Sequence, residues 1–210
     1  SRQCAAGGFN GQIWGVNPKR HQLDEHPCFA SVDDLPEAPD AAFVAVPAPV
    51  VPTVVDQLRK RGAGGVVCYS AGFGELGADG EALEQKLIEV SGDLALVGPN
   101  AFGLPNYIQG AHLWHYSHGG QRLPQGPAII SQSGMLSGYL LTNRRSVNFS
   151  YVIGAGNQSV LGVEDYLEAL LTRSEVTAFG IYLESLRDIP RFAKAALTAL
   201  DQNRPLVVIK

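Results

Sequence analysis

The chain has 210 residues, of which 45% are hydrophobic and 17% charged, and its formal net charge is −4. This length suggests one large domain or two small ones. A mildly acidic composition lacks the basic footprint of nucleic-acid-binding proteins, so we expect no nucleic acid partner. No apolar run reaches the roughly 20 residues of a membrane span, and no signal peptide is visible, so we expect a cytoplasmic protein without a membrane partner.

Short apolar runs alternate with helix-like segments along the chain, and this alternation is typical of βαβ units with a parallel sheet. The runs are almost continuously hydrophobic, as expected for strands that are buried on both faces. The predicted strands are residues 12–16, 42–46, 65–69, 94–97, 128–131, 150–153, 178–183 and 206–209. The predicted helices are residues 51–61, 80–90, 134–145, 163–172 and 190–202.

The periodicity stops between Tyr107 and Pro127, where the chain is polar, aromatic and rich in glycine. We interpret this stretch as an excursion and a linker, with the boundary near residues 120–126. The sequence therefore predicts an α/β protein of two consecutive doubly wound parallel-sheet domains, residues 1–122 and 123–210. The chain opens on a helix end with a glycine turn and closes on a strand, so we expect it to be part of a longer protein.

The spacing of His112, His115 and His118 suggests a metal site at first sight. On a helix the first two would share a face and the third would not, and the segment is loop-like. We favour aromatic packing on the domain surface and predict no metal. The three cysteines lie far apart and lack C-x-x-C spacing, which favours reduced thiols.

Ligands of open α/β sheets bind at the carboxyl ends of the strands, so the residues that follow each strand are the candidates for a site. Lys19 and Arg20 follow the first strand, and two cations there favour a phosphate on a ribose, as in NADP or coenzyme A. A solvated basic turn explains the same residues. Pro47 follows the second strand, where it forms either an apolar wall for an adenine or an ordinary helix start.

The next two strands run into Ser70, Ala71 and Gly72 and into Asn100. Small residues allow a ligand to approach the backbone closely, and an asparagine binds a polar group. Ordinary turn chemistry explains both segments equally well.

Three strand ends of the second predicted domain carry polar groups: Ser133 and Gly134 open a helix, residues 154–159 form a turn, and Glu184 ends the third strand. Two turns rich in N–H donors predict an anion, most simply a phosphate. Glu184 would repel this anion unless a cation lies between them. A protonated or phosphorylated histidine meets that requirement.

Ser133 could instead be the nucleophile of a hydrolase, since it lies at a strand-to-helix turn. That role needs a histidine and an acid within reach, and no histidine follows a strand of the second domain. The glycine that a nucleophile elbow needs two residues earlier is replaced by Ser131. We therefore favour the anion site.

Seven short motifs occur together and in order: VNPK, VPAP, SAGFGE, GPNAFG, SQSG, GAGNQ and YLES. In this order they resemble the NDP-forming acyl-CoA synthetase family, whose relatives include the succinyl-CoA synthetase alpha subunit. The resemblance covers essentially the whole chain. It implies a Rossmann-like CoA-binding domain followed by a flavodoxin-like ligase domain, each incomplete here, the first lacking its first strand and phosphate loop.

The resemblance also implies roles for individual residues. Glu184 matches the acid that orients a phosphorylated histidine, and Ser133 with Gly134 matches the helix N-terminus that receives its phosphoryl group. We expect Gly156 and Asn157 to contact the carboxylic acid substrate. The residues that match the CoA-contacting turns are Lys19, Pro47, Ser70, Ala71, Gly72 and Asn100.

The activity implied is the formation of an acyl-CoA from a small carboxylic acid, CoA and ATP, with release of ADP and phosphate, through an acyl phosphate and a phosphohistidine. ATP, ADP and Mg would bind a nucleotide-grasp domain or subunit outside this chain, and the histidine would follow Lys210. We expect a homo-oligomer. Two alternatives stay open: a non-catalytic CoA- or nucleotide-sensing regulatory domain of a larger protein such as a protein acetyltransferase, and an NADP-dependent oxidoreductase.

Overall fold

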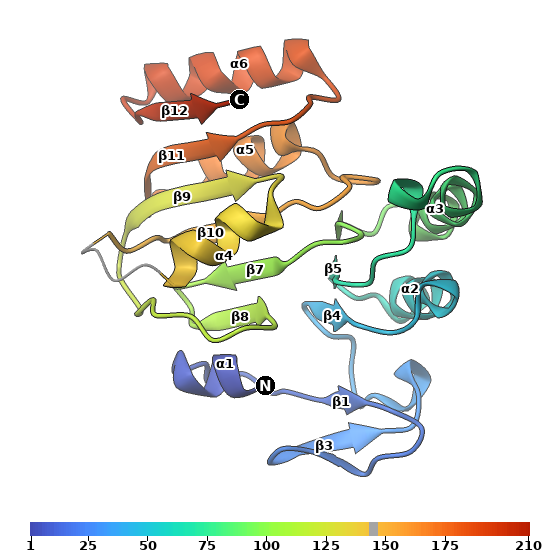
Figure 1. The fold of residues 1–210 in the computed structure, drawn as a ribbon. Helices are drawn as coiled ribbons and strands as arrows, with labels where there is room; N and C mark the ends of the chain where they lie inside the picture. Colours follow the sequence, from blue (N-terminus) through green and yellow to red (C-terminus); the bar gives the residue numbers. More distant parts are fainter. Residues whose placement is uncertain (143–146) are drawn as a thin grey trace.

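The computed structural model of the chain describes residues 1–142 and 147–210, and it confirms the predicted α/β class (Figure 1). The first unit contains a parallel three-stranded sheet in the order β4-β5-β6. Strands and helices alternate along the chain, as the apolar pattern predicts. They are β4 (Ala42–Val44), α2 (Val51–Arg61), β5 (Val66–Cys68), α3 (Ala78–Ser91) and β6 (Leu96–Val97).

Local sequence explains the elements of this unit. The central strand β5 is buried along its whole length, in keeping with its unbroken run of apolar side chains. Helix α2 ends where Gly62 takes a φ of 83°, a left-handed conformation that glycine adopts without strain. The cations of Arg59, Lys60 and Arg61 in the last turn interact favourably with the negative end of the helix dipole.

A smaller sheet with the order β1-β3-β2 precedes this unit and lies beside it (Figure 1). Its hairpin was not predicted, because each strand is short and carries too few apolar residues to show an alternation. Asp24 at the turn has a φ of 52°, a conformation that aspartate tolerates better than most side chains. The elements here are α1 (Arg2–Ala6), β1 (Gly15–Val16), β2 (Gln22–Leu23) and β3 (His26–Phe29).

The second unit is a six-stranded sheet in the order β12-β11-β9-β10-β7-β8, in which the four strands β9 to β12 run parallel. Strands β7 and β8 form an antiparallel hairpin that joins the edge of β10. The strands are β7 (Gly103–Asn106), β8 (Ala111–Trp114), β9 (Gly126–Ser131), β10 (Tyr151–Gly154), β11 (Val176–Tyr182) and β12 (Leu206–Ile209). The helices are α4 (Gly134–Thr142), α5 (Val163–Leu171) and α6 (Ile189–Asp201).

Both faces of this sheet are covered, as expected for a doubly wound unit. Ala128 and Ile130 of β9 pack in the core that contains α5 and α6, whereas Ile129 between them packs with Leu141 of α4. Successive residues of a strand point to opposite faces, so α4 and α5 cover opposite sides. The predicted helix 134–145 is α4, and its last three predicted residues lie outside the described part of the chain.

The hairpin β7–β8 corrects the prediction that the chain leaves the fold after Tyr107. Strand β8 lies inside the predicted excursion and yet belongs to the second sheet. Its alternation was hidden because one of its two buried positions is a histidine: His112 is 4% exposed and Trp114 is 5% exposed. The domain boundary at residues 122 and 123 stays a prediction, although this hairpin lies before it and pairs with the second sheet.

Three rings pack against one another at the base of the hairpin, in tilted and edge-to-face contacts. The imidazole of His112 lies 4.8 Å from the ring centre of Tyr107 and 4.3 Å from that of His118. Helix α1 packs on them: the amide of His112 donates to the Cys4 sulfur at 3.3 Å, and a Cβ at Gly7 would lie 2.4 Å from the imidazole. Burial, together with the neighbouring His118, lowers the pKa of His112 to about 4. Within the described residues, no group of three or more His, Cys, Asp or Glu side chains has the geometry to hold a metal ion.

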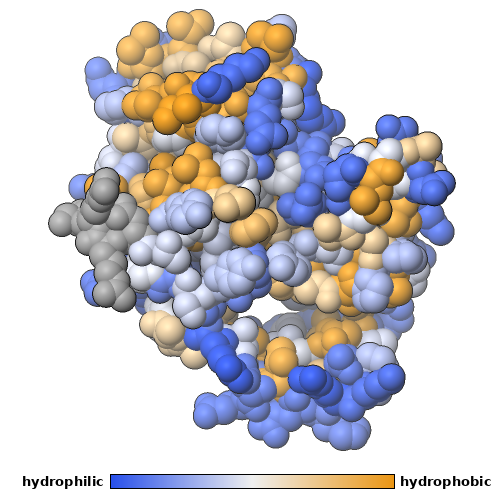
Figure 2. All heavy atoms as spheres, viewed as in Figure 1, coloured by the Kyte–Doolittle hydropathy of each residue, from blue (hydrophilic) through white to orange (hydrophobic). Residues whose placement is uncertain are grey.

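A group of exposed apolar side chains lies at one end of the molecule. Figure 2 shows them gathered over α6 and β12, where Leu197, Leu200, Val207 and Ile209 are each at least 60% exposed. The same view is hollowed between the small β1-β3-β2 sheet and the rest of the molecule (Figure 2). None of the helices in the described ranges is both long enough and apolar enough to cross a membrane.

The buried imidazole predicts acid sensitivity. Free imidazole has a pKa of about 6.5, so between about pH 6.5 and 4 the unfolded chain binds a proton that folded His112 does not. The free energy of unfolding should therefore fall as the pH drops through this window. His112→Phe, which keeps a ring but cannot titrate, should flatten part of this slope in urea denaturation at a series of pH values. His21→Phe, at an exposed position, is the control and should keep the wild-type slope; equal slopes in both variants would contradict the prediction.

Candidate functional site

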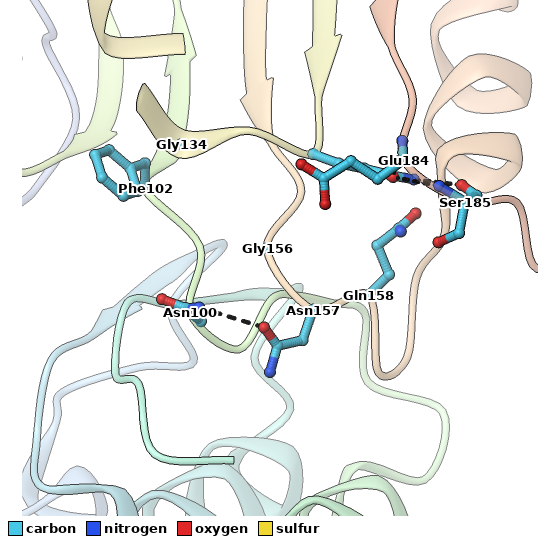
Figure 3. A pocket seen from close by; sticks show the side chains of 9 residues that line it. Asn100, Phe102, Gly134, Gly156, Asn157, Gln158, Glu184 and Ser185 are labelled. Carbon is cyan, nitrogen blue, oxygen red and sulfur yellow. Dashed lines mark hydrogen bonds between the residues drawn. The ribbon is translucent and has the colours of Figure 1, made fainter. Parts of the chain in front are cut away.

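A cavity of about 290 Å³ lies at the carboxyl ends of β9, β10 and β11, where the second unit faces the loop that follows β6 (Figure 3). Five of the residues that the sequence singled out line it together, although they come from four separate segments. The lining residues are Asn100, Phe102, Gln132, Gly134, Gly156, Asn157, Gln158, Glu184 and Ser185.

Ser133 lies just behind this lining and acts as a helix cap. Its hydroxyl accepts a hydrogen bond from the amide of Leu136 at 3.3 Å, and its own amide donates to the Ser131 hydroxyl at 3.2 Å. Within the described residues, Ser133 makes its hydrogen bonds with Ser131, Leu136 and Ser137 and with no histidine. The geometry therefore provides a capped helix start next to the cavity, without the base that a serine nucleophile requires.

Gly134 opens α4 directly beneath an aromatic ring. A Cβ on Gly134 would lie 2.3 Å from the ring of Phe102, so the ring packs on the bare backbone at the first turn of the helix (Figure 3). The unpaired N–H groups of a first helical turn attract anions. The absence of a side chain at Gly134 makes room for this ring, and both residues line the cavity, so the start of α4 borders it.

Gln132, which the sequence analysis did not single out, holds the loop that carries Glu184. Its side-chain oxygen accepts from the amides of Glu184 at 2.6 Å and Ser185 at 2.8 Å, and its side-chain nitrogen donates to the carbonyl of Ser185 at 2.5 Å. These three bonds join the loop after β9 to the loop after β11. The sequence offered no local signal for this role, because the partners of Gln132 lie 52 and 53 residues away along the chain.

The turn after β10 contacts the loop after β6 through backbone. Gly156 has a φ of 63°, and a Cβ there would lie 2.2 Å from the carbonyl oxygen of Pro99. The amide of Asn157 donates to that same carbonyl at 2.8 Å, and the side-chain nitrogen of Asn100 donates to the side-chain oxygen of Asn157 at 3.4 Å. Asn100 itself has a φ of 55°, which asparagine tolerates.

The residues predicted to contact CoA form a second group at the strand ends of the first unit. The Ser70 hydroxyl donates to the carbonyl of Val46 at 2.5 Å, and the Ser70 carbonyl accepts from the amide of Asn100 at 2.9 Å, so the ends of β4, β5 and β6 are tied together. Gly72 has a φ of 112°, and a Cβ there would lie 3.1 Å from that of Ala48.

Of the CoA residues, Asn100 is the one that also lines the cavity. Pro47, Ser70, Ala71 and Gly72 lie outside the lining, at the strand ends just described. Lys19 follows β1 in the separate small sheet, where its amide donates to the Asn17 side chain at 2.9 Å. The geometry thus gathers one set of residues around the cavity and leaves the others along the carboxyl edge of the first unit.

The charge of the cavity is unusual for an anion site, because the only ionisable side chain among the described residues that line it is the Glu184 carboxylate. Its other polar groups are amides, a hydroxyl and backbone N–H groups. A larger cavity of about 430 Å³ near the amino ends of β5, β10 and β11 is lined mainly by apolar side chains. The smaller cavity lies at the strand ends where α/β proteins bind ligands, so it is the candidate site.

The contact between Gly134 and Phe102 predicts a steric effect. Gly134→Ala should lower the free energy of unfolding by about 1–3 kcal/mol, since the added methyl group must displace the ring. Gly138→Ala in the same helix is the matched control: nothing lies within 4 Å of a Cβ there, and alanine should stabilise the helix by up to about 1 kcal/mol. Urea denaturation measures both values, and equal effects of the two variants would disprove the contact.

The three bonds of Gln132 predict local protection of the Glu184 loop. Gln132→Ala should speed hydrogen exchange at the amides of Glu184 and Ser185 by about fivefold to tenfold, the equivalent of about 1 kcal/mol. Gln132→Glu keeps an oxygen that accepts from both amides and should keep most of the protection. Exchange measured by mass spectrometry or NMR tests this, and unchanged rates in Gln132→Ala would refute it.

Two families of domains match the chain. Residues 2–104 match the CoA binding domain, and residues 124–210 match the Succinyl-CoA ligase like flavodoxin domain. Among curated proteins, the chain is 37% identical over 208 residues to a trans-feruloyl-CoA synthase of an unknown prokaryotic organism. It is 32% identical over 212 residues to the alpha subunit of the ADP-forming acetate–CoA ligase I of Pyrococcus furiosus. These alignments cover 96% and 97% of this chain.

Among solved structures, a dinucleotide forming acetyl-coenzyme A synthetase 1 of Ca. Korarchaeum cryptofilum, in complex with phosphate and ADP, superimposes with a TM-score of 0.87 at 28% identity and covers 100% of this chain. The chain spans 29% of the synthase, 45% of the alpha subunit and 45% of the solved chain. With a CoA-binding domain followed by a succinyl-CoA-ligase-like flavodoxin domain, the chain belongs to the NDP-forming acyl-CoA synthetase family.

Proposed function

We propose that this chain is the CoA-binding and phosphoryl-receiving part of an ADP-forming acid–CoA ligase. The observation that carries the proposal is one cavity that joins the open N-terminus of α4, the Glu184 carboxylate and the Gly156–Asn157 turn. The family membership and the ADP-forming relatives support it. The overall reaction converts a carboxylic acid, CoA and ATP into an acyl-CoA, ADP and phosphate.

The start of α4 is proposed to hold a phosphoryl group. Free N–H groups at the helix start, including that of Gly134, attract an anion, and Ser133 fixes this end of the helix by its cap. Glu184 would repel a bare phosphate, so we infer that a histidine carries the phosphoryl group and that its ring nitrogen bonds to Glu184. None of the five histidines of the sequence lines the cavity, and we therefore assign this histidine to a part of the protein beyond this chain.

The proposed reaction consists of three group transfers. ATP phosphorylates the histidine and leaves as ADP. A carboxylate oxygen of the acid, held near Gly156 and Asn157, then takes the phosphoryl group and forms an acyl phosphate, which frees the histidine. The CoA sulfur attacks the acyl carbon and phosphate leaves with the electron pair of the broken bond. A neighbouring nucleotide-grasp domain or subunit would supply ATP with Mg, in keeping with the relative that is itself an alpha subunit.

CoA is proposed to bind along the carboxyl edge of the first unit. The small residues Ser70, Ala71 and Gly72 would allow CoA to approach the protein backbone closely. Pro47 would form an apolar wall beside it. Asn100 lies between this edge and the cavity. Lys19 would bind a CoA phosphate from the neighbouring small sheet. This arrangement would bring the CoA sulfur to the acyl phosphate at Asn157.

The full-length protein should turn over ATP to ADP continuously only when CoA and a carboxylic acid are present, whereas incubation with ATP alone should give one equivalent of ADP and an acid-labile phosphoprotein. Coupled ADP detection measures the turnover, and phosphate-binding gels measure the phosphoprotein.

CoA should raise the melting temperature of the full-length protein, whereas NADPH should not. CoA binding without turnover of ATP would favour a regulatory domain instead. A rise in the melting temperature with NADPH and not with CoA would favour an oxidoreductase.

Glu184→Gln in the same protein should reduce phosphoprotein formation by about 10–100-fold, because the neutral amide no longer stabilises an imidazolium. The affinity for CoA, measured by calorimetry, should stay within about twofold of the wild-type value. Glu175→Gln, a carboxylate near the other ends of the strands, is the control and should leave phosphoprotein formation unchanged. A collapse of CoA binding in Glu184→Gln would overturn the assignment of the two sites.

A further inference from the structure

Two carboxylates of the first unit bridge to the turn that follows β10 in the second unit. Glu75 accepts from the amide of Gly72 at 2.6 Å with one oxygen and from the side-chain nitrogen of Asn157 at 2.6 Å with the other. Glu84 repeats the arrangement: it accepts from the amide of Gly74 at 2.7 Å and from the hydroxyl of Ser159 at 2.5 Å. Each glutamate therefore holds the turn after β5 with one oxygen and the turn after β10 with the other.

The two bridges differ in where they end. Asn157 lines the cavity, and its side-chain oxygen also accepts from Asn100, so its amide is fixed from both sides (Figure 3). Ser159 is buried and lies outside the cavity lining. The bridge of Glu75 thus reaches a group in the cavity, whereas that of Glu84 fastens the two units at a point away from it.

The chemistry of the Glu75 bridge requires an ionised carboxylate. Both partners are N–H donors, and only a carboxylate presents two acceptor oxygens to them. Burial by itself would raise the pKa of Glu75, but the hydrogen bonds from Gly72 and Asn157 hold it below its usual range. Ser159 is a hydroxyl that donates or accepts, so the Glu84 bridge survives replacement of one oxygen by an amide nitrogen.

We propose that Glu75 is a positioning residue that couples the predicted CoA turn, Ser70 to Gly72, to Asn157 in the cavity, so that a ligand at one site strengthens binding at the other. The inference rests on the proposed function, which places CoA at that turn and the phosphoryl and acyl groups in the cavity. A ligand that orders one end of the bridge also orders the other end. The second ligand then binds at a lower entropic cost.

The test uses the full-length protein, CoA as the ligand of the turn and inorganic phosphate as the probe of the cavity. Calorimetry gives the Kd of CoA with and without saturating phosphate. In the wild type, phosphate should lower this Kd by about fivefold or more, within the usual range of coupling between sites. In Glu75→Gln the amide nitrogen faces the nitrogen of Asn157, and the effect of phosphate should shrink to less than about twofold.

Glu84→Ala is the matched control, because it removes a bridge of the same type that ends outside the cavity, and it should keep the wild-type coupling. A double-mutant cycle then shows whether Glu75 acts through Asn157. Glu75→Gln in an Asn157→Ala background should change the coupling no further, since the bridge is already lost. A purely structural role would instead reduce coupling equally in Glu75→Gln and Glu84→Ala.

The outcomes separate this inference from the function on which it rests. If the wild type does not bind CoA, the proposed function fails. If CoA binds and phosphate leaves its Kd unchanged in the wild type, or changes it equally in Glu75→Gln, the coupling is refuted while the function stands. Additive effects in the double-mutant cycle would likewise refute the role of Asn157.

Discussion

The candidate site depends on one close approach, that of Gly156 to the loop after β6. A side chain at this position would meet the carbonyl oxygen of Pro99 at 2.2 Å, and the same carbonyl accepts the amide of Asn157. Because the backbone of one unit rests directly on the backbone of the other, Asn100 and Asn157 meet across the junction. The cavity lies at this contact, and the bridges of Glu75 and Glu84 join the same turn to the first unit.

The loops around the cavity are held in place by hydrogen bonds from side chains that flank the groups facing the cavity. Gln132 fixes the backbone of the Glu184 loop and leaves the carboxylate itself directed to the cavity. Ser133 fixes the start of α4 and leaves its free N–H groups to a ligand. Ser133 was among the predicted residues and Gln132 was not, yet both hold a neighbouring group of the cavity in place.

Much of the fold could be read from local pattern. Buried parallel strands such as β5 and β9 are continuous apolar runs, and α2 ends at Gly62 behind three basic residues as predicted. The hairpin β7–β8 was missed because His112 reads as polar although its ring is buried against Tyr107 and His118. The hairpin β2–β3 was missed because only two residues of each strand are paired, and so short a segment shows no alternation of apolar and polar residues.

The site was partly predictable for the same reason. Strand ends can be located from the apolar runs, and the rule that ligands bind there selects Asn100, Gly134, Asn157 and Glu184 without any three-dimensional information. Gln132 and Glu75 could not be selected in this way. Their importance comes from partners 52 and 82 residues away, and no local spacing encodes such a partner.

The sequence by itself determined the α/β class, the order of the main strands and helices, and the polar groups that end each strand, because burial and turn chemistry act over a few neighbouring residues. Only the tertiary structure decided which of these strand ends share a cavity, that a hairpin completes the second sheet, and that two glutamates bridge the units. Those features depend on the packing of one backbone against another, and its geometry is fixed only when the whole chain has folded.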